Sequence, residues 1–175
     1  DGPDASSHDD LRQVPGAFRE ACAGIETAKR AGLEFQINTT VTRRNLGLLP
    51  EMMKLARDLG ARAHHIFLLV PTGRAKDMAS EELSAGEYEK TLKFLAEEKK
   101  RTPLEIKITC APHYNRVLLQ DHACTAPSLT GRGCMGGVSF CFISHTGDVQ
   151  PCGYLELKCG NIRNKGFKDI WLEST

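Results

Sequence analysis

The amino-acid sequence predicts an α/β protein in which βα units of a parallel sheet or barrel precede a small cysteine-rich region. Helix and strand patterns alternate three times in the first 109 residues, at a spacing of roughly 35 residues that is typical of right-handed βαβ units. Six of the seven cysteines lie in the last 66 residues, where short strands and a turn replace this pattern. These observations predict three segments: βα units over 1–109, a connecting helix and loop over 110–133, and a cysteine-rich region over 134–175.

The expected helices of the first segment are each marked by a start or stop signal. Pro50 suits a first helical position, and Ser84 and Glu87 have the spacing of a capping box. Cys22 falls on the apolar face of the first helix, where we expect a buried thiol. The three helices cover residues 16–30, residues 50–59 and a segment that begins at Ser84.

The strands between these helices are expected over residues 33–41, 63–70 and 104–109. The second is a nearly continuous apolar run, as in parallel strands that are buried on both faces. Functional residues of such folds lie at the carboxyl ends of the strands. The loops that follow the strands therefore include the candidate functional residues, and the abrupt start at residues 1–4 is expected to form a turn.

A β-hairpin is the main feature of the last segment. A short helix over 112–120 and a loop precede strands over 138–144 and 148–151, which a turn at 145–147 joins. Cys134 and Cys152 flank the hairpin, so strand pairing should bring their thiols close together. A final helix is expected to turn Phe167, Ile170 and Trp171 inward.

The cysteines suit an iron–sulfur cluster better than disulfides or a zinc site. Their odd number, without an export signal, disfavours a disulfide framework. Zinc sites usually contain Cys-x2-Cys pairs, whereas the closest spacings here are Cys134-x6-Cys141 and Cys152-x6-Cys159. Clusters accept thiolates from separated loops. Cys134 and Cys152 are the leading candidate ligands, and Cys141 and Cys110 can face either a cluster or the protein core.

Composition and charge exclude several other classes of protein. The 175 residues carry 23 basic and 22 acidic side chains, so no excess of positive charge favours nucleic acid. The longest apolar run, residues 66–70, is far below the roughly 20 residues of a membrane-spanning helix, and the first residues do not resemble a signal peptide. We therefore expect a cytoplasmic protein without nucleic-acid or membrane partners.

Polar side chains near the strand ends are candidates for ligand binding. Asn38 and Thr40 share one face of the first strand, and His64 and His65 point to opposite faces of the second, so at most one histidine reaches the interior of a barrel. The guanidinium of Arg74 can bind a carboxylate in a bidentate manner, or it can be a solvated surface group.

His113 follows Cys110 at the end of the third strand. Its imidazole can ligate iron or hold a carboxylate, with a purely structural role as the alternative.

Several segments resemble the SPASM-domain radical S-adenosylmethionine (SAM) enzymes. Residues 133–137 (GCMGG), 141–154 (CFISHTGDVQPCGY), 160–163 (GNIR) and 169–171 (DIW) resemble the first half of a SPASM, or twitch-like, region, which holds an auxiliary iron–sulfur cluster. Residues 1–3, 8–9, 36–42 and 71–74 resemble the later strands of the partial TIM-type barrel of the same enzymes. The spacing Cys134-x12-Gly147-x4-Cys152 is the most specific part of this resemblance.

This resemblance implies cofactors and roles for individual residues, although no catalytic residue can be identified. A 4Fe-4S cluster is expected at the hairpin, with SAM and a second 4Fe-4S cluster in the full-length enzyme. The implied residues are Asn38, Thr40 and Arg74 for SAM, His65 and His113 for the substrate, and Cys134, Cys152, Cys141 and Cys110 for the cluster.

Within this superfamily, the segments 109–114 and 69–74 most resemble the siroheme-dependent haem biosynthesis enzymes of the haem b synthase type. The resemblance implies oxidative decarboxylation of two iron-coproporphyrin propionates to vinyl groups, with a small-molecule substrate and an electron donor such as ferredoxin or flavodoxin. A didecarboxysiroheme deacetylase and a peptide-modifying SPASM maturase remain alternatives. An iron–sulfur or zinc binding module without catalysis is an alternative from another class.

The sequence departs from the family pattern in one respect that concerns activity. It contains no Cys-x3-Cys-x2-Cys motif, which the SAM-binding cluster of the superfamily requires, and no later SPASM cysteines before Thr175. Three strands are also too few to close a barrel. We therefore expect these residues to be the middle and later part of a longer enzyme, and to be inactive alone.

Overall fold

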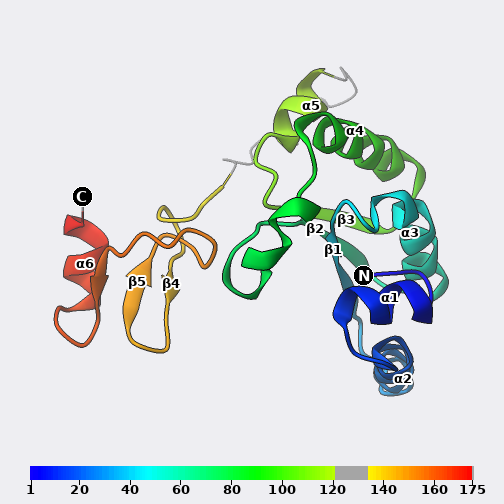
Figure 1. The fold of residues 1–175 in the computed structure, drawn as a ribbon, viewed down its shortest axis with the longest axis horizontal. Coiled ribbons are helices and arrows are strands. Elements are labelled where there is room, and N and C mark those ends of the chain that lie inside the picture. Colours follow the sequence, from blue (N-terminus) through cyan, green and yellow to red (C-terminus); the bar gives the residue numbers. More distant parts are fainter. Residues whose placement is uncertain (121–133, 175) are drawn as a thin grey trace. The chain divides into compact units, whose positions relative to one another are not determined.

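The computed structural model describes residues 1–120 and 134–174, with the main chain but not the side chain of Arg74. The chain divides into two compact units, Asp1–Leu129 and Thr130–Thr175. The first contains a parallel sheet with helices and the second a small antiparallel sheet with one helix (Figure 1). The predicted α/β class is confirmed, while the segment boundaries at residues 109 and 133 stay a prediction.

The sheet of the first unit has three parallel strands in the order β1-β2-β3. These are β1 (Gln36–Val41), β2 (Ala63–Leu68) and β3 (Glu105–Thr109). Helix α3 (Leu49–Asp58) connects β1 to β2, and helix α4 (Ala85–Arg101) connects β2 to β3. The expected alternation of strand and helix is confirmed, with the strands slightly shorter than the apolar runs suggest.

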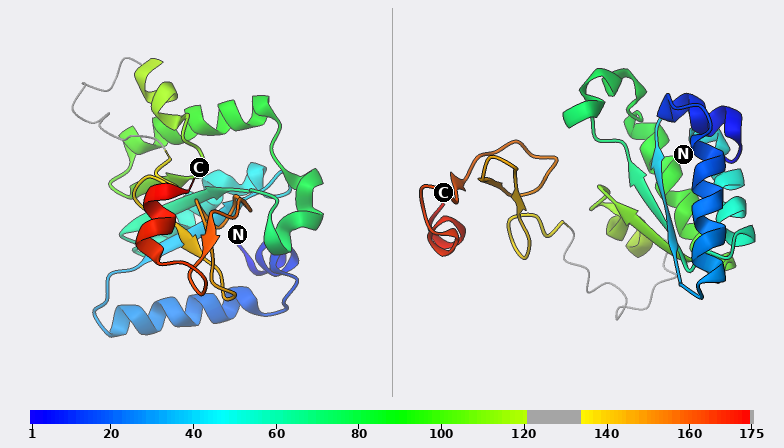
Figure 2. Two further views of the ribbon diagram at one scale, coloured as in Figure 1. Left: turned by 90° about the vertical axis from the view of Figure 1, so that its left-hand side faces the viewer. Right: turned by 90° about the horizontal axis from the view of Figure 1, so that it is seen from below.

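The hydrophobic core lies between one face of this sheet and the helices, which gather on one side of the strands in Figure 2. Apolar side chains from both layers are almost completely buried: Val41, Ile66 and Leu68 from the strands, and Leu49, Met53, Leu92 and Leu95 from the helices. Burial of such side chains is the main stabilising contribution to the fold. The opposite face of the sheet, which points away from this core, carries mainly polar residues.

Helix α4 begins at the capping box that the sequence predicts. The side chain of Ser84 accepts a hydrogen bond from the main-chain N–H of Glu87, and the Glu87 carboxylate accepts one from the N–H of Ser84 at 2.8 Å. Both bonds satisfy N–H groups that the first helical turn would leave without partners.

Two helices precede the sheet, and the first was not expected. Helix α1 (Ala5–Arg12) begins where Asp4 accepts a hydrogen bond from the N–H of Ser7 at 2.9 Å. Helix α2 (Ala17–Arg30) is capped by the carboxylate of Asp9, which accepts bonds from the N–H groups of Gly16 and Phe18. The turn predicted at residues 1–4 is therefore followed directly by a helix.

Short helical segments complete the first unit. These are the 3-10 helices η1 (Leu46–Leu48) and η2 (Gly73–Glu81) and the helix α5 (Tyr114–Gln120). Among the described residues, no helix has both the length and the apolar character needed to cross a membrane.

The second unit is an antiparallel sheet of β4 (Phe142–Ile143), β5 (Asp148–Gln150) and β6 (Gly160–Asn161), followed by α6 (Phe167–Glu173). The predicted hairpin is confirmed. Its first strand is shorter than expected because the N–H groups of residues 138 and 139 bond to the carbonyl of Met135 in a turn.

Helix α6 packs against β6 through one residue in particular. Ile170 is 2% exposed, and a Cβ placed on Gly160 would lie 2.9 Å from its Cγ1, so this glycine allows the close approach. Trp171 is half-buried. Phe167 is 44% exposed, so the expectation that it faces inward was wrong; the buried residue of α6 is Ile170.

Candidate functional site

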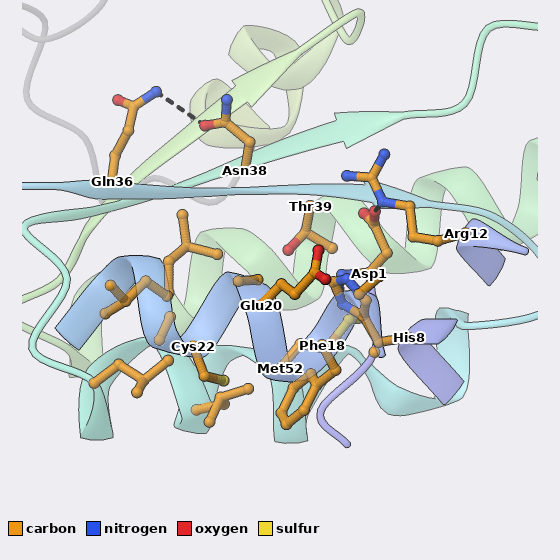
Figure 3. A pocket seen from close by; sticks show the side chains of 18 of the residues that line it. Asp1, His8, Arg12, Phe18, Glu20, Cys22, Gln36, Asn38, Thr39 and Met52 are labelled. Carbon is orange, nitrogen blue, oxygen red and sulfur yellow. Dashed lines mark hydrogen bonds and ion pairs between the residues drawn. The ribbon is translucent and has the colours of Figure 1, made fainter. Parts of the chain in front are cut away.

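The face of the parallel sheet opposite the core carries the polar residues that the sequence singles out. Along β1, Thr39 and Val41 are buried, whereas Asn38 is exposed and Thr40 is half-buried. Figure 3 shows Asn38 on the side of β1 that points away from helix α2. Two rows of side chains cross this open face in register: Asn38, His65 and Lys107, then Thr40, Phe67 and Thr109.

The adjacent histidines His64 and His65 are separated by the sheet, as strand periodicity predicts. His64 lies in the core with no exposed surface, and its Nε2 shares a 2.8 Å hydrogen bond with the hydroxyl of Thr39. Its Nδ1 has no hydrogen-bond partner among the described residues. Burial lowers the pKa of His64 to about 4, so this imidazole is neutral at physiological pH.

His65 is the histidine on the open face, which supports its choice as a candidate ligand-binding residue. Its Nε2 shares a hydrogen bond with the hydroxyl of Thr109, and its ring lies 4.3 Å from that of Phe67, at an interplanar angle of 35°. Burial, together with the positive charge of Lys107, lowers the pKa of His65. This side chain is therefore a fixed and neutral group.

Two of the three residues expected to bind SAM, Asn38 and Thr40, lie on the edge strand β1 of the same face. The amide oxygen of Asn38 accepts a hydrogen bond from Gln36 Nε2 at 2.9 Å, and the main-chain N–H of Thr40 donates to the Asp1 carboxylate at 2.7 Å. Arg74 lies in η2, but its side chain is outside the described part of the structure. Its expected contact with a carboxylate therefore stays a prediction.

The loop after β3 holds Cys110 and His113 in a defined arrangement. Cys110 has a φ of 62°, in the left-handed region that favours glycine. The hydroxyl of Tyr88 donates a hydrogen bond to the Cys110 carbonyl, and the Tyr88 ring lies 4.6 Å from that of His113. Burial is the main cause that raises the pKa of Tyr88 to about 12, so the hydroxyl keeps its proton as a donor.

In the second unit, Cys134 and Cys152 converge as the hairpin predicts. A Cβ placed on Gly136 would lie 3.6 Å from the sulfur of Cys134 and 3.4 Å from Cβ of Cys152, so both cysteines border the same small space. The same Cβ would lie 3.2 Å from the main-chain oxygen of Pro151. The absence of a side chain at Gly136 therefore permits this approach.

Cys141 lies next to this pair in the hairpin. The β4–β5 register pairs Phe142 with Gln150, which places Cys141 opposite Pro151 and one residue from Cys152. Cys134 is exposed, whereas Cys141 and Cys152 are half-buried, and all three are free thiols. Two converging thiols and a third nearby are consistent with part of the ligand set of an iron–sulfur cluster.

The described residues do not complete such a ligand set. No group of three or more histidine, cysteine or acidic residues within 1–120 and 134–174 is placed to hold a single metal ion. Cys110 belongs to the first unit, so its role beside the hairpin cysteines stays a prediction.

A groove of about 490 Å³ lies between α2, β1 and α3. Apolar side chains line much of it, including Phe18, Cys22, Ile25 and Met52, several of which Figure 3 shows. Cys22 is half-buried at this groove, so the expectation of a core thiol was wrong. The reason is that no residue of α2 is fully buried against the sheet.

Three residues around these sites were not singled out by the sequence. Lys107 and Thr109 share the open face with His65, and the strand register is needed to find them. The role of Tyr88 could not be found from the sequence, because its hydroxyl contact with the Cys110 carbonyl depends on the tertiary fold. Gly136, two residues after Cys134, is a local signal of close packing in the sequence.

Comparison with known proteins agrees with this arrangement. Residues 134–175 match the profile of the SPASM family, described as an iron–sulfur cluster-binding domain. Over 99% of its length the chain is 52% identical to the AdoMet-dependent heme synthase of Oleidesulfovibrio alaskensis, of which it covers 47%. The chain resembles SPASM-domain radical SAM enzymes. The similarity to this heme synthase thus includes the three parallel strands as well as the hairpin.

Further matches support the same relationship. The chain is 44% identical to the AdoMet-dependent heme synthase of Methanosarcina barkeri, over 98% of this chain and 51% of that protein. The chain spans about half the length of these curated relatives. A solved structure described as native anSMEcpe with bound AdoMet and Kp18Cys peptide has a TM-score of 0.58 at 20% identity, and it covers 91% of this chain and 44% of that one. This last match shows a shared fold.

Proposed function

We propose that this chain is part of a radical SAM enzyme that converts two propionates of iron-coproporphyrin to vinyl groups by oxidative decarboxylation. The observation that carries the proposal is the 52% identity, over almost the whole chain, to an AdoMet-dependent heme synthase. The open face of the sheet supports it, because polar groups from three strands are available there to bind a cofactor and a carboxylated substrate.

The chemistry of this reaction requires a cofactor that generates a radical and a path for one electron. SAM and the iron–sulfur clusters, when bound, supply hydrogen-atom abstraction and one-electron transfer, and carbon dioxide leaves each propionate. An electron donor such as ferredoxin or flavodoxin is part of the proposal, as is a cytoplasmic location.

The residues of this chain would bind and orient the reactants. Asn38, Thr40 and Arg74 are proposed to bind SAM, and His65 and His113 to bind the substrate. His65 suits this role because the bond to Thr109 holds its ring in place, and preorganised contacts reduce the cost of binding.

The cluster ligands proposed for the second unit are Cys134 and Cys152, with Cys141 and Cys110 as further ligands. The approach of Cys134 and Cys152 around Gly136 supports the first two. The thiolate form binds iron, and the exposed or half-buried positions of these thiols leave them accessible.

The test uses the full-length protein after anaerobic reconstitution, incubated with SAM, a reductant and iron-coproporphyrin. The expected result is formation of 5′-deoxyadenosine together with a porphyrin that has lost two carboxyl groups, detected by mass spectrometry. If the enzyme instead converts a peptide or didecarboxysiroheme, that compound is the substrate and the proposed one is wrong. An absence of SAM cleavage with every substrate would leave the non-catalytic binding module as the better description.

A second experiment tests the cluster ligands. Iron and sulfide are measured in the Cys134→Ser/Cys152→Ser double variant, with Cys22→Ser as a matched control because its thiol lies in the groove of the other unit. We expect the double variant to lose auxiliary cluster content and the control to keep it. Full cluster content in the double variant would refute the assignment.

A further inference from the structure

Lys107 gives the open face of the sheet its positive charge. Strand alternation places three residues of each strand on this face. They are Gln36, Asn38 and Thr40 of β1, Ala63, His65 and Phe67 of β2, and Glu105, Lys107 and Thr109 of β3. Among these described strand residues, Lys107 is the one that is cationic at neutral pH, because the lowered pKa keeps His65 neutral. An anionic group that binds to this face would therefore form its ion pair with Lys107 on β3.

The ammonium group of Lys107 is available for such a partner. Its nearest acidic neighbour is Glu105, at 3.8 Å, and the two side chains are 43% and 55% exposed. Exposed pairs of this kind contribute little free energy and are readily exchanged. A ligand carboxylate that is partly shielded from water would form a stronger, charge-assisted bond with the same lysine.

An aromatic surface lies beside this lysine. His65 is the direct register partner of Lys107, and the ring centres of His65 and Phe67 lie 4.3 Å apart, with the two rings tilted by 35°. The bond between His65 and Thr109 holds the imidazole in this position. Neighbouring aromatic side chains offer an apolar surface, and one ring of such a pair can contact the face or edge of a planar ring system.

We infer that Lys107 binds a carboxylate of the substrate while the His65–Phe67 ring pair contacts the planar ring that bears this carboxylate. The inference rests on the proposed function and adds Lys107 and Phe67 to the substrate contacts. It also divides the open face, with the substrate on the β3 side and SAM on the β1 side. SAM contains a carboxylate and a flat ring as well, so the test measures the two ligands separately.

The experiment titrates the full-length protein with iron-coproporphyrin and follows the absorbance of the porphyrin. We expect Lys107→Met to raise the Kd for iron-coproporphyrin about tenfold, the loss of one charge-assisted bond. Lys107→Arg should restore binding to within about threefold of wild type, because the charge is kept. Lys99→Met, on an exposed lysine near the end of α4, should bind like the wild type.

Two further measurements show whether Lys107 binds a carboxylate of iron-coproporphyrin or SAM. The methyl ester of iron-coproporphyrin has no free carboxylates, so Lys107→Met should not change its Kd, and the Kd for SAM should also stay unchanged. Equal binding of iron-coproporphyrin by the wild type and Lys107→Met would overturn the inference, as would an effect of the variant on SAM alone. Failure of the wild-type enzyme to bind iron-coproporphyrin would instead refute the proposed function itself.

Discussion

The hydroxyl of Tyr88 donates a hydrogen bond to the main-chain carbonyl of Cys110, and this contact links helix α4 to the loop after β3. The same tyrosine ring packs on His113, with ring centres 4.6 Å apart. Tyr88 thereby supports both candidate residues of the loop at once. The backbone at Cys110, with its φ of 62°, depends on this support because an L-residue rarely adopts such a conformation.

The strained backbone at Cys110 leads to a prediction about stability. Glycine adopts a positive φ without a steric penalty, whereas alanine does not. We expect Cys110→Gly to have a free energy of unfolding about 1 kcal/mol higher than Cys110→Ala. Urea denaturation followed by circular dichroism measures the difference. Because both variants lack the thiol, equal stabilities would show that the backbone is relaxed, whatever the role of the sulfur.

A methyl group at residue 136 should interfere with the approach of the two hairpin cysteines. The new Cβ of Gly136→Ala would lie 3.2 Å from the carbonyl oxygen of Pro151, a main-chain atom that cannot easily move. We expect about tenfold weaker retention of iron in competition with a chelator. Gly153→Ala is the matched control, since its Cβ would make an ordinary 3.4 Å contact with the Phe142 ring next to Cys152. Equal iron retention by the two variants would contradict the prediction.

His64 should make the stability of the first unit depend on pH. Its pKa is about 4 in the folded protein against 6.5 for the free group, so between these values the unfolded chain binds a proton that the folded chain does not. The contribution of His64 to the free energy of unfolding is fully present above pH 6.5. It decreases by roughly 3 kcal/mol in total as the pH falls towards 4. In His64→Gln the slope of the free energy of unfolding should be shallower over this range. An unchanged slope would assign the pH dependence to other groups.

The layers of the first unit should differ in their sensitivity to truncation. Leu92 of α4 is completely buried, and Leu92→Ala should lower the free energy of unfolding by about 3 kcal/mol. Ile25 of α2 lines the groove and is only half-buried, so Ile25→Ala should cost less than about 1 kcal/mol. Both values come from denaturant titration of the same protein. A larger loss at Ile25 than at Leu92 would mean that α2 carries more of the core than its burial indicates.

The regular part of the fold was predictable because its signals are local and periodic. Apolar residues at helical and strand spacing identified α3, α4 and the three parallel strands, and the Ser84–Glu87 pair marked the start of α4. Helix α1 was missed because Ala5–Arg12 has no apolar face, and only the cap at Asp4 marks it. Strand β6 was missed because a pair of residues is too short to show a period.

The candidate site was predictable only where neighbouring residues define it. The period of a strand is enough to separate His64 from His65, and the hairpin turn is enough to bring Cys134 towards Cys152. Lys107 lies more than 40 residues from His65 in the sequence, so their pairing depends on the register of β2 and β3. A single lysine without a motif gives no local sign of such a partner.

The outer strands of the parallel sheet have a consequence for handling the protein. Within the described residues, β1 and β3 each pair with one strand, so their other edges present main-chain groups to any strand that approaches. The Asp1 carboxylate occupies the N–H of Thr40 on one edge, and the charged side chains of Glu105 and Lys107 stand on the strand at the other. Buffers that neutralise or screen these charges should promote edge-to-edge self-association of this 175-residue chain, which makes ionic strength the first condition to control when it is purified.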